Sequence, residues 1–92
     1  MGRQVQLHLI IHGRVQGVFF RLYAKEAADR LRLTGFARNT EDGSLELVAE
    51  GFPERLDEFE RGMRKGPHLA HIESVFAQRK EASGRFTRFA LR

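Results

Sequence analysis

The sequence contains no cysteine, and this absence excludes several kinds of chemistry. Without cysteine the chain has no disulfide framework, no thiolate nucleophile and no Cys-ligated metal. Long apolar runs are also missing, because no stretch approaches the roughly 20 apolar residues that span a bilayer. Near the start, Gln6 and His8 interrupt the apolar residues and no small-residue cleavage site follows, so a signal peptide is not expected. We therefore expect a cytoplasmic protein with no membrane partner.

The residues that are present suffice for one domain, residues 1–92. Apolar residues make up 41% of the chain and include eight Phe, which allows a substantial core. We expect four of these rings in that core, at Phe20, Phe36, Phe52 and Phe59. Thirteen of the 16 basic residues are Arg, and the net charge of +4 suits anionic partners. The charge is modest and forms no like-charged block, so a nucleic acid partner is not indicated.

The spacing of apolar residues predicts two helices among several strands. Alternation with a period of two indicates strands, whereas a period near 3.6 indicates helices. Gly35 is expected to end the first helix, since glycine is common just past a helix C-terminus. The expected elements are strand 5–12, helix 20–33, strands 36–40 and 45–50, helix 53–65, strand 71–80 and a short strand 85–91.

The connections between these elements complete the expected fold. Asp42-Gly43 is a strong hairpin signal, and residues 81–84 are expected to form the last turn. Ile72 and Val75 are out of phase, which indicates a bulge or bend in their strand. The order β-α-β-β-α-β plus a terminal strand predicts an α+β, ferredoxin-like (split β-α-β) fold. Its two helices would cover one face of a mostly antiparallel sheet of four to five strands.

Residues 12–21, HGRVQGVFFR, hold the strongest functional signal. A strand, a loop bracketed by glycines and a helix start follow one another, an order that forms anion cradles from backbone N–H groups. Arg21 stands at the helix start, where a cation opposes the helix dipole unless an anion offsets it. Its guanidinium can hold two oxygens of one phosphoryl group. The expected phosphate-binding amides are those of Val15, Gln16, Gly17, Val18 and Phe19.

Asn39 is the candidate for placing an attacking water, because an amide can accept from water and donate to phosphate. On local grounds alone, an Asn before a hairpin is more often a turn residue. The Thr40 hydroxyl is expected to fix the Asn39 side chain. Arg14 and Arg38 are expected to be surface charges, with attraction of the substrate as the alternative.

His8 and His12 could suggest a metal site, but geometry argues against it. On a strand, side chains four residues apart lie roughly 13 Å from each other. No cofactor and no metal site are therefore expected.

Two blocks of the chain resemble the signature blocks of the acylphosphatase family: GRVQGVFFR at 13–21 and GFARNTEDGSLE at 35–46. Lys65-Gly66-Pro67 and the closing run 86–92 also look like landmarks of that family, so the resemblance spans nearly the whole chain. It implies a ferredoxin-like fold and metal-independent hydrolysis of acyl phosphates to a carboxylate and phosphate.

The same two blocks assign roles to single residues by their resemblance to the family. By resemblance, Arg21 binds phosphate and Asn39 orients the attacking water. Phe36 stands where that family often has Trp, and Ala37 where it has a β-branched residue, but neither change touches the proposed chemistry. The expected partners are a small acyl phosphate and inorganic phosphate, and the expected state is a monomer.

Two functions without catalysis are the alternatives. A ferredoxin-like module can bind single-stranded RNA on its open sheet face, yet Glu46 and Glu50 on that face would repel a phosphate backbone. A regulatory domain that binds a small anion and does not transform it is harder to separate from an enzyme by sequence.

Overall fold

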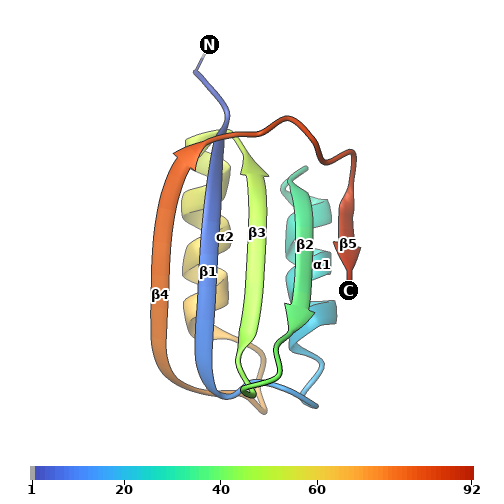
Figure 1. The fold of residues 1–92 in the computed structure, drawn as a ribbon, viewed down its shortest axis with the longest axis vertical. Helices are drawn as coiled ribbons and strands as arrows, with labels where there is room; N and C mark the ends of the chain where they lie inside the picture. Colours follow the sequence, from blue (N-terminus) through green and yellow to red (C-terminus); the bar gives the residue numbers. More distant parts are fainter. Residues whose placement is uncertain (1) are drawn as a thin grey trace.

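The computed structural model of the protein describes residues 2–92. Seven elements follow one another in the order β-α-β-β-α-β-β (Figure 1). They are β1 (Val5–Arg14), α1 (Phe20–Arg30), β2 (Thr34–Asn39), β3 (Leu45–Gly51), α2 (Pro53–Lys65), β4 (His71–Glu81) and β5 (Phe89–Leu91).

The strands form one sheet in the order β4-β1-β3-β2-β5, and both helices lie on the same face of it (Figure 1). The neighbouring strands are antiparallel except for β2 and β5, which run parallel. This arrangement confirms the predicted fold class.

The core lies between the sheet and the helices, because alternate strand residues and one stripe of each helix face each other. Gly51 at the end of β3 leaves room for the buried Leu33, because a Cβ at Gly51 would stand 2.4 Å from Leu33 Cδ2. The buried core side chains include Leu7, Leu9, Ile11, Phe20, Ala24, Ala28, Leu45, Leu47, Leu56, Phe59, Met63 and Phe89.

Helix α1 ends earlier than predicted and without glycine. Arg32 adopts a left-handed conformation, with φ 57°. The N–H of Leu33 donates to the Ala28 carbonyl at 2.8 Å and that of Arg32 to the Asp29 carbonyl at 3.2 Å, which is a Schellman motif. Gly35 lies instead within β2, where a Cβ would stand 1.8 Å from the Val48 carbonyl oxygen. The predicted stop at Gly35 is therefore wrong, because close approach to β3 requires that glycine.

The predicted bulge is confirmed in β4. His12 pairs with Ser74 whereas Gly13 pairs with Ile72, so Glu73 is the extra residue. Pairing with β4 continues to Arg14, and Gly13 thus belongs to β1 rather than to the loop.

The segment after β4 is a crossover and not the predicted tight turn. It passes over one end of the sheet from β4 at one edge to β5 at the other (Figure 1). The buried Glu50 carboxylate fastens it, accepting from the Ser83 N–H at 2.7 Å and the Gly84 N–H at 3.0 Å. As a result, β5 is shorter than expected and begins at Phe89.

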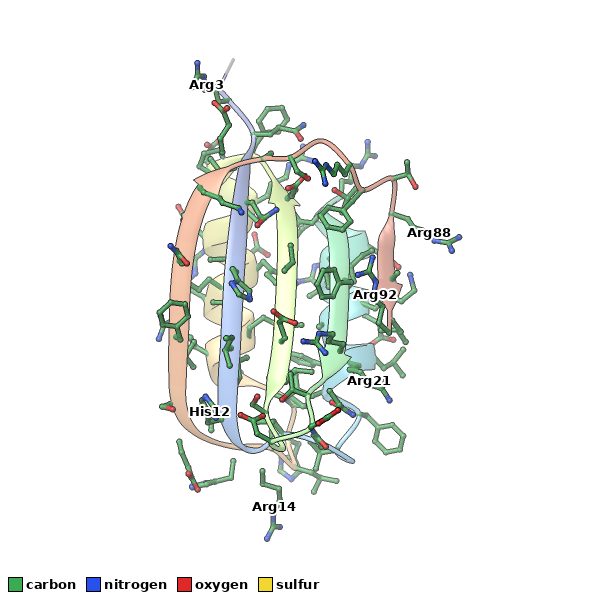
Figure 2. All side chains as sticks on the ribbon, viewed as in Figure 1. Arg3, His12, Arg14, Arg21, Arg88 and Arg92 are labelled. Atoms are coloured by element: carbon green, nitrogen blue, oxygen red, sulfur yellow. The ribbon has the colours of Figure 1, made fainter. Side chains whose placement is uncertain are left out.

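The face away from the helices is partly covered. Phe36 lies there rather than in the core as predicted, because it alternates with the buried Gly35 and Ala37. Its ring centroid is 5.9 Å from that of Phe86 and 4.1 Å from the guanidinium of Arg92, which Figure 2 labels. Phe20 and Phe59 are buried as expected, whereas Phe52 is half-buried at the N-terminus of α2.

Candidate active site

The loop between β1 and α1 presents backbone donors that the rest of the chain does not use. Gly17 and Phe19 both have positive φ, 72° and 60°, which turns the chain sharply before α1 begins. Phe19 caps the helix without a side-chain hydrogen bond, and the first turn of α1 contains no acidic residue. Within residues 2–92, none of the N–H groups of residues 15–19 donates to another protein group. These amides therefore remain available at the positive end of a helix.

A pocket of about 310 Å³ lies beside this loop. It brings together Arg21 from the first turn of α1 and Asn39 from the end of β2, as the sequence predicted. Three of the five predicted loop residues line it, whereas Gln16 and Val18 do not. The lining residues are Val15, Gly17, Phe19, Phe20, Arg21, Leu22, Asn39 and Leu91.

Arg21 is held at the pocket by the end of the chain. Its Nη1 donates to the main-chain oxygen of Arg92 at 2.8 Å, and Figure 2 labels both residues beside β5. A guanidinium has five N–H donors in a rigid plane, so this one bond leaves others for an anion.

Asn39 carries an unusual buried atom. Its Oδ1 is buried and accepts no hydrogen bond from any group in residues 2–92. A buried acceptor left unpaired costs about 1–3 kcal/mol, so native proteins rarely keep one without a reason. Asn39 itself lines the pocket, and rotation of its amide about the Cβ–Cγ bond would turn this oxygen toward a water there.

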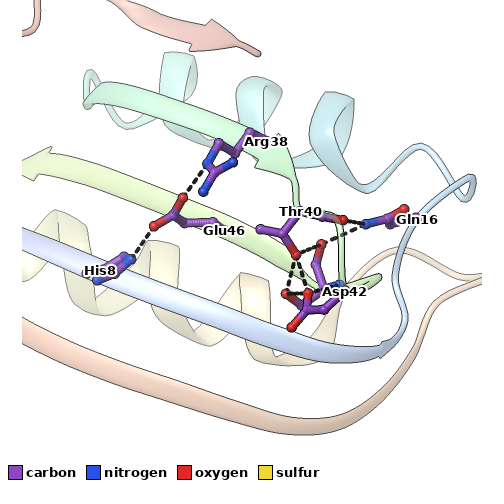
Figure 3. A network of polar contacts seen from close by, with 7 residues as sticks. His8, Gln16, Arg38, Thr40, Asp42 and Glu46 are labelled. Atoms are coloured by element: carbon purple, nitrogen blue, oxygen red, sulfur yellow. Dashed lines mark hydrogen bonds and ion pairs between the residues drawn. The ribbon is translucent and has the colours of Figure 1, made fainter.

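The Gln16 side chain fastens the loop to the β2–β3 turn (Figure 3). Its Nε2 donates to the main-chain oxygens of Thr40 at 2.8 Å and Ser44 at 2.9 Å. The loop of residues 15–19 and the strand end at Asn39 are thereby held in one arrangement. The sequence indicates a role only for the backbone of Gln16, because nothing local shows where its side chain reaches.

Thr40 does not fix Asn39 as predicted, because its hydroxyl is used within the turn. It lies at hydrogen-bonding distance from the Asp42 carboxylate and 2.6 Å from the Ser44 hydroxyl (Figure 3). Hydrogen bonds from the Ser44 and Thr40 hydroxyls hold the pKa of Asp42 well below its usual range. Asp42 therefore stays ionised and stabilises the turn.

Arg14 and Arg38 lie outside the pocket lining. Arg14 is exposed and points away from the body of the molecule (Figure 2). Arg38 pairs with Glu46 at 2.5 Å, and His8 contacts the same carboxylate at 2.8 Å (Figure 3). Desolvation opposes ionisation of Glu46, but the bonds from Arg38 and His8 outweigh it and lower its pKa. A role of these arginines in attracting substrate stays a prediction.

Sequence reasoning missed Leu22 and Leu91, which line the pocket. Leu22 follows Arg21 directly and could have been suspected from that position. Leu91 could not have been suspected from the sequence, since only the pairing of β5 with β2 sets it opposite Ala37.

The described residues contain no group of three His, Asp or Glu side chains placed to hold a metal ion. Among residues 2–92, no helix combines the length and apolarity needed to cross a membrane.

Comparison with known proteins places the chain in a family. The family model described as Acylphosphatase matches residues 7–91. An acylphosphatase of Methylococcus capsulatus is 42% identical over 86 residues, 94% of each chain, and one of Syntrophotalea carbinolica is 38% identical over 90 residues, 98% of each chain. The crystal structure of acylphosphatase from Bacillus subtilis superposes with a TM-score of 0.91 at 30% identity, covering 95% of this chain and 97% of that one. With the fold and nearly the full length in common, this chain belongs to the acylphosphatase family.

Proposed function

We propose that the loop of residues 15–19 and Arg21 bind the phosphoryl group of an acyl phosphate, and that Asn39 orients the water that attacks it. As a member of its family, the chain is an enzyme that hydrolyses acyl phosphates. The observation that carries these roles is the shared pocket, whose lining contains both Asn39 and Arg21.

Binding of the phosphoryl group follows from the charges at the loop. Three phosphoryl oxygens keep their negative charge through the reaction and accept hydrogen bonds from the unused backbone N–H groups. The helix dipole of α1 adds a positive potential at the same place. Arg21 supplies a planar pair of donors, and its bond to the Arg92 oxygen orients the guanidinium before substrate arrives.

Hydrolysis then needs one oriented water. The Asn39 amide, turned about its Cβ–Cγ bond so that Oδ1 faces the pocket, accepts a hydrogen bond from this water and directs the water oxygen toward phosphorus, in line with the acyl oxygen. As the new P–O bond forms, the bond from phosphorus to the acyl oxygen breaks, and its electron pair leaves with the carboxylate. Both water protons stay with the phosphate product. A carboxylate is a good leaving group, so the reaction requires no general acid. Because the chain has no cysteine and residues 13–21 contain no Ser or His, the attack is assigned to water and not to a side chain that would form a phosphoenzyme.

Neither alternative without catalysis receives support. On the face that RNA would have to use, Glu46 is ionised and Glu50 is only 3% exposed. The Phe36 ring on this face is packed under Arg92 and against Phe86, so it does not offer a free stacking surface. The monomeric state and the cytoplasmic location remain predictions.

The test is hydrolysis of benzoyl phosphate in EDTA by wild type, Arg21→Ala and Asn39→Ala. We expect kcat/KM to fall at least about 10²-fold in each variant, the size of effect seen when one charge-stabilising donor is removed. Arg30→Ala is the matched control, because Arg30 is an exposed arginine at the other end of α1 and should leave the rate unchanged.

Circular dichroism should show that all three variants are folded. Near-native turnover by folded Arg21→Ala or Asn39→Ala would disprove that residue's role. Loss of wild-type activity in EDTA would disprove metal-independent hydrolysis.

A further inference from the structure

We propose that Phe19, Leu22 and Leu91 form a binding surface for an apolar acyl group. The enzyme would then prefer acyl phosphates with an aromatic or aliphatic acyl group over those whose acyl group carries a second negative charge. This inference rests on the proposed function, since it assigns the substrate class of the same pocket.

The first observation is where the exposed apolar side chains gather. Three of the five large exposed hydrophobic residues in the described part of the chain line this one pocket. Phe19 is 76% exposed, Leu22 47% and Leu91 45%. Clusters of exposed apolar side chains beside a few polar groups are typical of ligand sites.

The fold explains how three residues from distant segments meet. Phe19 directly precedes α1 and Leu22 is the third residue of that helix, and both line the pocket. Leu91 comes from β5, where it pairs with Ala37, and the Arg92 N–H donates to the Ala37 carbonyl at 2.9 Å. Because Ala37 precedes Asn39 by two residues on β2, this pairing brings Leu91 to the Asn39 end of the sheet.

The second observation is the charge of the lining. Arg21 is the only charged residue among the eight that line the pocket. In the proposed mechanism the phosphoryl group occupies the free N–H donors of Arg21. No cation of the pocket lining is then left for a carboxylate on the acyl chain. Placing an unpaired carboxylate against apolar side chains is costly. The net charge of +4 attracts any anion at long range but supplies no partner inside this pocket.

A matched pair of substrates tests the preference. Benzoyl phosphate and 4-carboxybenzoyl phosphate differ by one carboxylate, and acetyl phosphate lacks the ring. After correction for uncatalysed hydrolysis rates, we expect wild-type kcat/KM to be at least about tenfold higher for benzoyl phosphate than for the carboxylated analogue, the scale of discrimination that an apolar pocket provides.

Two variants test the residues themselves. Leu22→Ala should lower the ratio of kcat/KM for benzoyl phosphate over acetyl phosphate by about tenfold. Leu91→Lys should remove or reverse the preference against 4-carboxybenzoyl phosphate, because it supplies the missing cation. Leu69→Ala and Leu69→Lys are the controls, since Leu69 is 63% exposed and lies outside the pocket.

The outcomes separate the two proposals. Two ratios decide the outcome: kcat/KM for benzoyl phosphate over acetyl phosphate, and kcat/KM for benzoyl phosphate over 4-carboxybenzoyl phosphate. If Arg21→Ala abolishes turnover but both ratios are the same in Leu22→Ala, Leu91→Lys and wild type, the acyl surface is disproved and the proposed function stands. If wild type hydrolyses none of the three substrates, both fail. Ratios that change in the pocket variants and not in the Leu69 variants support the surface.

Discussion

At the scale of single residues, Asn39 shows a conflict between stability and chemistry. Its Oδ1 is buried and unpaired within residues 2–92, although the side chain stands at the end of a well-paired strand. In the proposed mechanism the amide rotates and this atom accepts a hydrogen bond from the attacking water. The free protein is destabilised by the same atom, because a buried acceptor has lost its solvation.

Replacing Asn39 with Ala should therefore separate the two effects. We expect the free energy of unfolding to stay equal to that of wild type or to rise by up to about 1 kcal/mol, while benzoyl phosphate turnover falls about 10²-fold. Urea denaturation measures the free energy of unfolding, and the rate of benzoyl phosphate hydrolysis measures turnover. A loss of more than about 2 kcal/mol would instead indicate a structural role for the side chain.

At the scale of elements, the end of α1 depends on a residue in a costly conformation. Arg32 occupies the left-handed position of a Schellman motif, where glycine is the usual residue. A side chain with a Cβ is strained there by about 1 kcal/mol or more.

Arg32→Gly should consequently stabilise the protein by about 0.5–1 kcal/mol, measured as a rise in the urea midpoint. Glu26→Gly is the matched control, because Glu26 is exposed in the middle of the same helix and the change should cost about 1 kcal/mol there. Destabilisation by both changes would show that Arg32 is not strained.

The crossover between β4 and β5 depends on the ionised Glu50. Desolvation opposes its charge, but hydrogen bonds from the Ser83 N–H, Gln6 and the Gly84 N–H outweigh that effect and lower its pKa. A carboxyl whose pKa is lower in the folded state stabilises the protein above the unfolded pKa. This contribution is lost as the pH falls through the folded value.

We expect Glu50→Gln to be about 1–3 kcal/mol less stable than wild type at pH 7, because an amide replaces a charged acceptor of three bonds. The difference should shrink once the pH falls below about 4.3, the value of a Glu carboxyl in the unfolded chain, and vanish as the pH falls through the lower folded value. Urea denaturation at pH 7 and pH 3 checks this. An equal difference at both pH values would contradict the role of the charge.

At the scale of the whole molecule, the charge affects the encounter with substrate. The chain carries +4, and its proposed substrates are anions. Attraction at long range is screened over about 8 Å at physiological ionic strength.

Accordingly, kcat/KM for benzoyl phosphate should fall severalfold between about 20 and 300 mM salt, whereas kcat changes little. Arg14→Ala should reduce this salt dependence if the exposed Arg14 attracts substrate. A kcat/KM that does not respond to salt would exclude steering by the net charge.

Much of the fold and of the candidate site could be predicted, because the signals are local. The period of apolar residues located both helices and the main strands, and the out-of-phase Ile72 and Val75 marked a real bulge. The loop before α1 located Arg21, and the second signature block located Asn39, both of which line the pocket. Local signals failed at Gly35 and Thr40, where contacts with other segments decide the role.

What the sequence by itself determined is the set of elements, the core stripes and the types of residue at the candidate site, since each depends on neighbours along the chain. Only the tertiary structure decided the crossover, the position of Leu91, the bonds of Gln16 and the burial of Asn39 Oδ1. The bond from Gln16 to Thr40 joins residues 24 apart, and that from Arg21 to Arg92 joins residues 71 apart. Contacts of this kind form only when whole elements pack, so no local pattern of residues encodes them.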